Sequence, residues 1–177
     1  MAKITEEYRK MQQDLHKSRP DYGVASINFA GQVSNIINEN NITELLDYGA
    51  GKGRLAQNLK VNHKVDIRLY DPAIPEWSAE PESKEMVCCI DVLEHIEPEL
   101  LDNVLDDLKR VTKRVGFFTV HTGPAVKVLP DGRNAHLIQE PPKWWLPKFL
   151  DRFDLISFSK IPSGFLVIVQ PLKETQP

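Results

Sequence analysis

An acidic residue followed by three glycines at every second position is the pattern in this sequence that points most directly to chemistry. The acid is Asp47, and the glycines are Gly49, Gly51 and Gly53. Glycines in a tight turn let the backbone adopt positive φ and approach a ligand without a Cβ in the way. A helix beginning near Lys52 would add free N–H groups and the positive end of its dipole. We therefore expect this turn to be a cradle for a nucleotide-type ligand.

Two further acidic residues stand where strands are expected to end. Asp71 follows the alternating run 65–70, and Asp91 follows the apolar run 86–90, which is typical of a central parallel strand buried on both faces. Asp71 lies 24 residues after Asp47, and at an exposed strand tip its carboxylate could accept both hydroxyls of a ribose. Because ligands of open α/β sheets bind beyond the carboxyl ends of the strands, we expect the three carboxylates to share one site.

The glycine turn differs from the dinucleotide fingerprint G-x-G-x-x-G. That fingerprint would need a glycine at position 54, where the sequence has Arg54. A carboxylate at the strand end would also repel a phosphate, whereas it suits a cationic ligand. An NAD-linked oxidoreductase is therefore disfavoured, and titration with a nicotinamide cofactor would test it.

Two motifs of the chain resemble those of class I S-adenosylmethionine (SAM)-dependent methyltransferases. The run Asp47-x-Gly49-x-Gly51-x-Gly53 is similar to their first motif, and Asp91-Val92-Leu93-Glu94-His95 is similar to the fourth motif of their small-molecule branch. Unassigned bacterial and phage members have similar segments at 22–23, 71–75 and 131–136. The resemblance implies that the cofactor is SAM and that these residues bind it: Asp47, Gly49, Ala50, Gly51, Gly53, Asp71, Pro72, Asp91, Val92 and Glu94.

The same resemblance implies a fold and a reaction. The fold is a Rossmann-like α/β three-layer sandwich, with a mostly parallel sheet and an antiparallel hairpin at its C-terminal end. The reaction is transfer of the sulfonium methyl group to a small-molecule acceptor. For this reaction the protein chiefly aligns the reacting atoms, and it removes a proton where the nucleophile is a hydroxyl.

Histidines are the candidates for the base, because a neutral imidazole titrates near working pH. His121, at the tip of the expected strand 115–120, is favoured over His136 in the following loop and over His95, and a structural role is open for each. An acceptor is expected to contact polar and aromatic residues that the core does not require, with Arg133 serving an anionic one. These residues are Tyr22, Arg133, Asn134 and Trp144, of which Trp144 could instead pack its helix on the sheet.

The pattern of the chain supplies the elements that would position these residues. Residues 1–41 are expected to be an N-terminal helical cap segment, and residues 42–172 a class I methyltransferase domain, within one globular domain overall. Only 14 residues, 72–85, precede the third strand, too few for the helix and strand usual here, so the sheet is expected to be trimmed. The expected helices are 3–17, 24–39, 52–60, one from Pro98 and 141–150, and the expected strands are 43–48, 65–70, 86–90, 115–120, 153–159 and 164–170.

Composition limits the classes of function. The 177-residue chain is 41% hydrophobic, which suits one domain, and its net charge of −3 implies no general affinity for nucleic acid or anionic membranes. It has no apolar run long enough to span a bilayer and no signal-peptide core, so we expect a cytoplasmic protein without a membrane partner. The sequence has no signal for an oligomeric state.

Cys88 and Cys89 are expected to be buried thiols, and no metal site is expected because C-x-x-C and H-x-x-x-H spacings are absent.

Two other functions fit parts of the pattern. A binding or regulatory module could keep the SAM site without performing chemistry, and turnover of an acceptor would distinguish it. A nucleic-acid or nucleotide methyltransferase is the other, but the sequence has no Asn/Asp-Pro-Pro-aromatic motif for exocyclic amines and no Pro-Cys nucleophile. Four cations are interpreted as partners of a helix dipole rather than as a nucleic-acid patch: Lys109, Arg110, Lys113 and Arg114.

Overall fold

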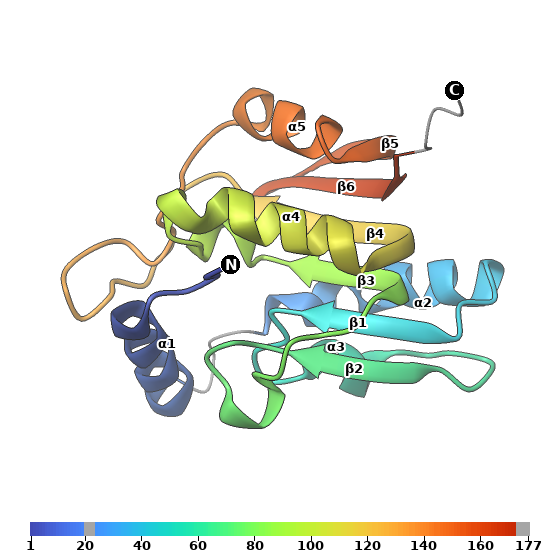
Figure 1. The fold of residues 1–177 in the computed structure, drawn as a ribbon, viewed down its shortest axis with the longest axis horizontal. Helices are drawn as coiled ribbons and strands as arrows, with labels where there is room; N and C mark the ends of the chain where they lie inside the picture. Colours follow the sequence, from blue (N-terminus) through green and yellow to red (C-terminus); the bar gives the residue numbers. More distant parts are fainter. Residues whose placement is uncertain (20–23, 173–177) are drawn as a thin grey trace.

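The computed structural model describes residues 1–19 and 24–172. Within them, the strands form one six-stranded sheet in the order β2-β1-β3-β4-β6-β5 (Figure 1). The strands are β1 (Glu44–Tyr48), β2 (Asp66–Tyr70), β3 (Lys84–Ile90), β4 (Thr112–His121), β5 (Phe153–Ile161) and β6 (Gly164–Pro171). Strands β1 to β4 are parallel, whereas β6 runs antiparallel to both β4 and β5. This confirms the predicted mostly parallel sheet with a C-terminal hairpin.

Helices cover both faces of the sheet and make three layers (Figure 1). Helices α4 (Leu101–Val111) and α5 (Pro142–Leu150) pack on one face, and α2 (Ala30–Glu39) and α3 (Arg54–Asn58) pack on the other. Apolar spacing decides these faces, since Trp145 and Phe149 lie four residues apart in α5 and are both buried. Short 3₁₀ helices complete the described chain: η1 (Ala25–Phe29), η2 (Pro75–Trp77), η3 (Leu93–His95) and η4 (Pro98–Leu100).

The two cysteines show how the central strands supply both cores. Cys88 packs in the core under α2 and α3, and Cys89 packs in the core under α4 and α5, because successive strand residues point to opposite faces. Both are free thiols and fully buried, as predicted. Burial raises the pKa of each thiol well above its usual value, so neither is activated as a nucleophile.

The sheet is trimmed on the side of β2, as the sequence analysis predicted. In the described ranges, only the short helix η2 lies between β2 and β3, and no strand lies beyond β2 in the sheet. Strands β1 and β3 are neighbours in the sheet, but the strands that follow them lie on opposite sides: β2 lies beside β1, and β4 lies beside β3. Their shared edge is the topological switch point, where open α/β sheets bind ligands.

The cations after α4 have partners other than the helix dipole. Strand β4 starts at Thr112, immediately after α4, so Lys113 and Arg114 belong to the strand. Lys113 Nζ lies 3.1 Å from a carboxylate oxygen of Glu44, and Arg114 pairs with Glu85 at 3.0 Å. The dipole interpretation was therefore wrong for these two residues.

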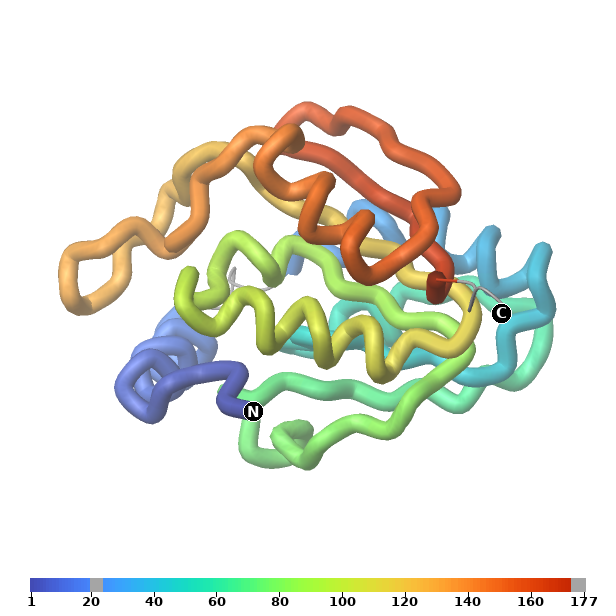
Figure 2. Tube along the Cα trace, turned by 45° about the horizontal axis from the view of Figure 1, so that its top comes forward, coloured from blue at the N-terminus to red at the C-terminus, as the bar shows by residue number. Residues whose placement is uncertain are grey.

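Helix α1 (Glu6–Ser18) lies beyond the carboxyl ends of the parallel strands, beside the connection between β4 and α5 (Figures 1 and 2). Tyr8 and Leu15 of α1 pack against Leu129 and Ala135 of that connection. At the start of the helix, the backbone N–H and the hydroxyl of Thr5 both donate to the Glu97 carboxylate, at 2.8 and 2.7 Å. Within the expected cap segment, α1 thus covers the strand ends while α2 packs on the sheet. Among the described helices, none is long and apolar enough to cross a membrane.

Candidate functional site

A pocket of ≈ 410 Å³ lies beyond the carboxyl ends of the parallel strands, against one face of α1. Its volume is typical of small-molecule sites. Eight of the ten residues expected to bind a cofactor line it: Asp47, Gly49, Ala50, Gly51, Asp71, Pro72, Asp91 and Val92. The other two, Gly53 and Glu94, are outside its lining. Gly53 is the residue before α3, and Glu94 is fully buried.

The turn after β1 has left-handed backbone at all three of its glycines, with φ of 77°, 53° and 65°. A Cβ on Gly49 would collide with the side chain of Val92. The expected helix from Lys52 was wrong, because α3 begins only at Arg54 and is five residues long. A right-handed helix cannot include the left-handed Gly53.

Most N–H groups of this turn donate hydrogen bonds within the protein. Those of Gly49 and Ala50 donate to the Tyr70 carbonyl at the end of β2, and that of Gly51 donates to the Asp71 carboxylate. The turn therefore offers a ligand close approach to the backbone rather than a set of free donors. This arrangement suits a ligand without phosphate groups, since phosphate sites rely on such donors.

The Asp47 carboxylate is buried at the end of β1 with one oxygen lacking a partner. The residue is 3% exposed, and its Oδ2 makes no hydrogen bond with any residue that the structure describes. Burial, and then the nearby Asp71 charge, raise the pKa of Asp47 to about 7. A cation in the pocket would compensate both, because it would pair with the charge and contact the unpartnered oxygen.

Asp71 corrects the expectation of an exposed strand tip, because its side chain is buried. Its Oδ2 accepts a hydrogen bond from the Gly51 N–H at 3.0 Å, and its Oδ1 accepts one from the Ala73 N–H at 2.9 Å. Burial raises the pKa of Asp71, although the two hydrogen bonds and the nearby His16 oppose the shift. The carboxylate thus joins the glycine turn to the segment after β2, and each oxygen keeps acceptor capacity for a ligand.

Replacing Asp71 by Ala is expected to lower the free energy of unfolding by about 1–3 kcal/mol, because two buried N–H groups lose their acceptor. Asp66→Ala is a matched control at the other end of β2, since Asp66 is exposed and pairs with Lys84. We expect this control to change stability little. Urea denaturation of both variants measures the difference, and equal small losses would show that Asp71 does not hold the turn.

Asp91 turns the chain away from the sheet at the end of β3. Its φ of 52° is positive, which is uncommon outside glycine. Thr119 of β4 fixes this conformation, because its hydroxyl accepts from the Asp91 N–H at 3.0 Å and donates to Asp91 Oδ1 at 2.7 Å. Strained backbone that neighbours hold in place is typical of binding sites, and here it lies at the switch point.

Two histidines of the pocket have the same tautomer. His136 Nδ1 donates to the Gly123 carbonyl at 2.7 Å, and His95 Nδ1 donates to the Ala135 carbonyl at 2.8 Å. In its neutral form, each ring therefore carries its lone pair on Nε2. Burial lowers the pKa of both histidines, that of His95 to about 3. Both are consequently neutral at pH 7.

His121 lies at the end of β4, as predicted, but it has the other tautomer. Its Nδ1 accepts from the Gly123 N–H at 3.1 Å, so the neutral ring carries its proton on Nε2. The ring centroid of His121 lies 4.6 Å from that of His136. The geometry therefore arranges His121 to donate a hydrogen bond and His136 to accept one.

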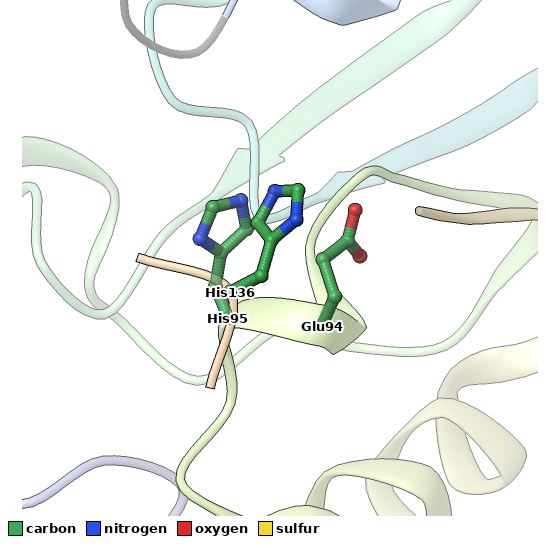
Figure 3. Close-up of side chains that lie close together, drawn as sticks. All are labelled: Glu94, His95 and His136. Atoms are coloured by element: carbon green, nitrogen blue, oxygen red, sulfur yellow. The ribbon is translucent and has the colours of Figure 1, made fainter. Parts of the chain in front are cut away.

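Glu94 brings a carboxylate into the same group of side chains, from the helix η3 (Figure 3). Its Oε1 accepts from the backbone N–H of His121 at 3.0 Å, whereas Oε2 has no hydrogen-bond partner among the described residues. One potential ligand atom from each of Glu94, His95 and His136 lies within 4.8 Å of the other two. Local spacing could not reveal this group, because His136 follows His95 by 41 residues.

Comparison with known proteins identifies solved structures that share the fold of this chain. No family model matches the chain, and no curated protein matches its sequence. Among solved structures, a Burkholderia thailandensis 1,6-didemethyltoxoflavin-N1-methyltransferase with bound 1,6-didemethyltoxoflavin and S-adenosylhomocysteine has a TM-score of 0.61 at 15% identity, covering 98% of this chain and 93% of its own. The DhpI–S-adenosylhomocysteine complex has a TM-score of 0.61 at 12% identity, covering 97% and 100%. The 16S rRNA methylase ArmA has 0.57 at 15%, covering 94% and 97%.

The chain has the fold of the class I methyltransferases. Three of the residues expected to bind an acceptor lie outside the pocket lining of this methyltransferase fold. Arg133 is half-exposed and pairs with Asp131 at 2.7 Å. The Asn134 amide bonds both backbone groups of Ala125, and so closes the loop. Trp144 lies on the outer side of α5, under Lys148. The fourth, Tyr22, lies outside the described residues.

Helix α1 supplies pocket residues that the sequence analysis missed. Tyr8, Gln12 and His16 line the pocket of the methyltransferase fold. They are spaced by four residues, which places them on one face of a helix. That spacing was visible in the sequence, but two polar residues on a helix are usually solvated, so the pattern alone did not separate a pocket wall from a surface.

Proposed function

We propose that this protein is a SAM-dependent methyltransferase that acts on a small molecule. The observation that carries the proposal is the buried Asp47 carboxylate. Its Oδ2 has no partner in the described chain, and the residue lines a pocket at the switch point. SAM is a cation with a sulfonium and an ammonium group, so it would compensate this carboxylate. The glycine turn fits the same ligand, because it provides close approach without donors for a phosphate.

The residues that would hold SAM are those of the three strand ends. Asp47 would pair with the cationic amino-acid end, and Asp71 would accept from the ribose hydroxyls. Asp91, fixed by Thr119, would border the same ligand from β3. Bound SAM supplies an activated methyl group, so the protein chiefly orients the acceptor and excludes water.

The acceptor side of the pocket is proposed to lie at the histidines. His136 and His121 line the pocket at the end of β4, and their tautomers let the first accept a hydrogen bond and the second donate one. His136 is thus a better proton acceptor than His121 in this geometry, because His121 would first have to release the Gly123 N–H. A hydroxyl group on the acceptor would match this pair.

Two features favour a small molecule over a nucleic acid. Helix α1 forms one wall of the pocket with Tyr8, Gln12 and His16, which gives the site the concave shape that small molecules bind. The net charge is −3, and the cations Lys113 and Arg114 are paired with carboxylates. The toxoflavin enzyme is a solved structure of this fold with a small-molecule acceptor bound.

The proposal predicts that the protein binds SAM and S-adenosylhomocysteine with micromolar affinity, because three strand ends and the glycine turn form one continuous cradle. Isothermal titration calorimetry with each ligand measures this, and titration with NAD provides the negative control. No heat with either SAM ligand at millimolar concentration would contradict the proposal. Binding without turnover of any acceptor in a screen with labelled SAM would instead indicate a regulatory module.

A further inference from the structure

Glu94, His95 and His136 gather three potential metal ligands beside the pocket (Figure 3). We propose that they form a binding site for one divalent transition-metal ion, with Zn²⁺ as the probe. Figure 3 shows the two imidazole rings next to each other, with the Glu94 carboxylate beside them. One potential ligand atom of each residue lies within 4.8 Å of the other two. Two imidazoles and one carboxylate are a donor set typical of such ions.

The two histidines are held as metal ligands usually are. A ligating histidine generally donates its other N–H to a carbonyl or carboxylate, which fixes the tautomer and the ring orientation. His95 Nδ1 donates to Ala135 and His136 Nδ1 donates to Gly123, each to a backbone carbonyl. These bonds assign Nε2 of both rings as the ligand atoms. The loop between β4 and α5 supplies both carbonyls, so the supporting shell is built into its backbone.

Glu94 provides an independent observation that points to a cation. Its side chain is 0% exposed, and Oε2 has no hydrogen-bond partner among the described residues. An unpartnered, buried carboxylate oxygen is costly, and a bound cation removes that cost. The other oxygen, Oε1, already accepts from the His121 N–H at 3.0 Å, so the side chain is oriented while Oε2 remains to bind the ion.

The donor set and its spacing select the kind of ion. Two imidazole ligands favour Zn²⁺ and the later first-row transition metals over Mg²⁺, Ca²⁺ and Mn²⁺, which prefer oxygen. Tetrahedral bonds of about 2.0–2.2 Å place ligand atoms roughly 3.3–3.6 Å apart. The three side chains, whose potential ligand atoms lie within 4.8 Å of one another, would therefore have to move closer together as the ion binds. Three protein ligands also leave positions open for another molecule.

The position of this metal site suggests what its open positions would bind. His95 and His136 both line the pocket, so an ion between them would lie at the acceptor side. This role rests on the proposed function, and it would replace direct hydrogen bonding of the acceptor to His136, because Nε2 of His136 would then bind the ion. The class of acceptor that fits is a small molecule with a hydroxyl or phenol oxygen that can bind the ion directly, since a bound cation orients such a group and lowers its pKa. Metal binding itself does not depend on SAM.

The test is metal binding to the full chain after removal of metals with a chelator. Calorimetry with Zn²⁺ is expected to give one equivalent at micromolar affinity or tighter, with Mg²⁺ at least 100-fold weaker. Co²⁺ is expected to develop visible absorption bands from nitrogen ligation. Absence of Zn²⁺ binding would overturn the proposal, as would Mg²⁺ affinity equal to that of Zn²⁺.

Two variants locate the ion. Glu94→Gln keeps an oxygen for the His121 N–H but loses the charge, and it is expected to weaken Zn²⁺ binding at least 10-fold. The control is His63→Ala, because both ring nitrogens of His63 contact oxygens of Asn62 and Ile42 outside the cluster. Unchanged binding in Glu94→Gln, or an equal loss in His63→Ala, would overturn the site. SAM titration of the metal-free parent reports the proposed function separately.

Discussion

Asn in place of Asp47 is expected to weaken SAM binding about 10-fold to 150-fold and, at pH 8, to stabilise the ligand-free protein. The loss of affinity corresponds to one charge-assisted contact, worth about 1.5–3 kcal/mol. The gain in stability follows because the amide has no charge to bury. A substitution that removes a binding group and stabilises the fold is characteristic of a site that keeps a buried charge for its ligand.

The pH dependence has a definite sign. Burial raises the pKa of Asp47 from 3.8 to about 7 in the folded chain, so between these values the folded state holds a proton that the unfolded state has released. Stability therefore falls as pH rises through this window, by about 1.4 kcal/mol per unit and by at most about 4 kcal/mol in all. SAM, which pairs with the ionised form, should bind more tightly as pH rises through 7.

Urea denaturation at pH 5 and pH 8, together with calorimetry of SAM binding, checks both parts of this expectation. The contribution of Asp47 should disappear from the pH dependence of the Asn variant. Asp66→Asn is the control, because Asp66 is exposed on the neighbouring strand. A variant that lost stability at pH 8 would show that Asp47 already has a structural partner, and this would remove the main support for a cationic ligand.

The second large effect is expected at Gly164, which begins β6 opposite His121 of β4. An added Cβ would collide with the carbonyl oxygen of Val120 and lie 3.0 Å from His121 Cα. These are backbone atoms of β4, so they cannot move away without breaking hydrogen bonds between β4 and β6. Gly164→Ala is therefore expected to lower the free energy of unfolding by about 3 kcal/mol or more.

Gly31→Ala is the matched control for this prediction. Gly31 lies in α2, and a Cβ there would meet nothing within 4 Å. The control is expected to gain about 0.5–1 kcal/mol, because alanine is the better helix former. Chemical denaturation of both variants measures the two changes. A loss of less than about 1 kcal/mol at Gly164 would mean that β4 and β6 can separate there at little cost.

The sequence predicted the features that depend on local pattern. Strand ends, the buried thiols and the trimmed sheet follow from alternation, apolar runs and the short 72–85 segment. The start of α3 was missed because propensity does not report that Gly53 is left-handed. Asn134 was assigned to an acceptor because it is polar, whereas its amide closes a loop. The grouping of His136 with Glu94 required the path of a long connection, which no local spacing encodes.

The attachment of helix α1 to the rest of the protein links ligand binding to the stability of the docked helix. The helix is fastened at its start by Thr5 to Glu97 and near its end by Lys52, whose Nζ donates to the carbonyls of His16 and Arg19. Because one face of α1 is a wall of the pocket, a ligand must either pass around it or displace it. If the helix must be displaced, the free energy of displacing it slows entry and exit of the ligand. Contacts between the bound ligand and α1 then stabilise the docked helix. By thermodynamic linkage, these attachments tune the affinity for a ligand that contacts the docked helix, although Thr5, Glu97 and Lys52 do not line the pocket.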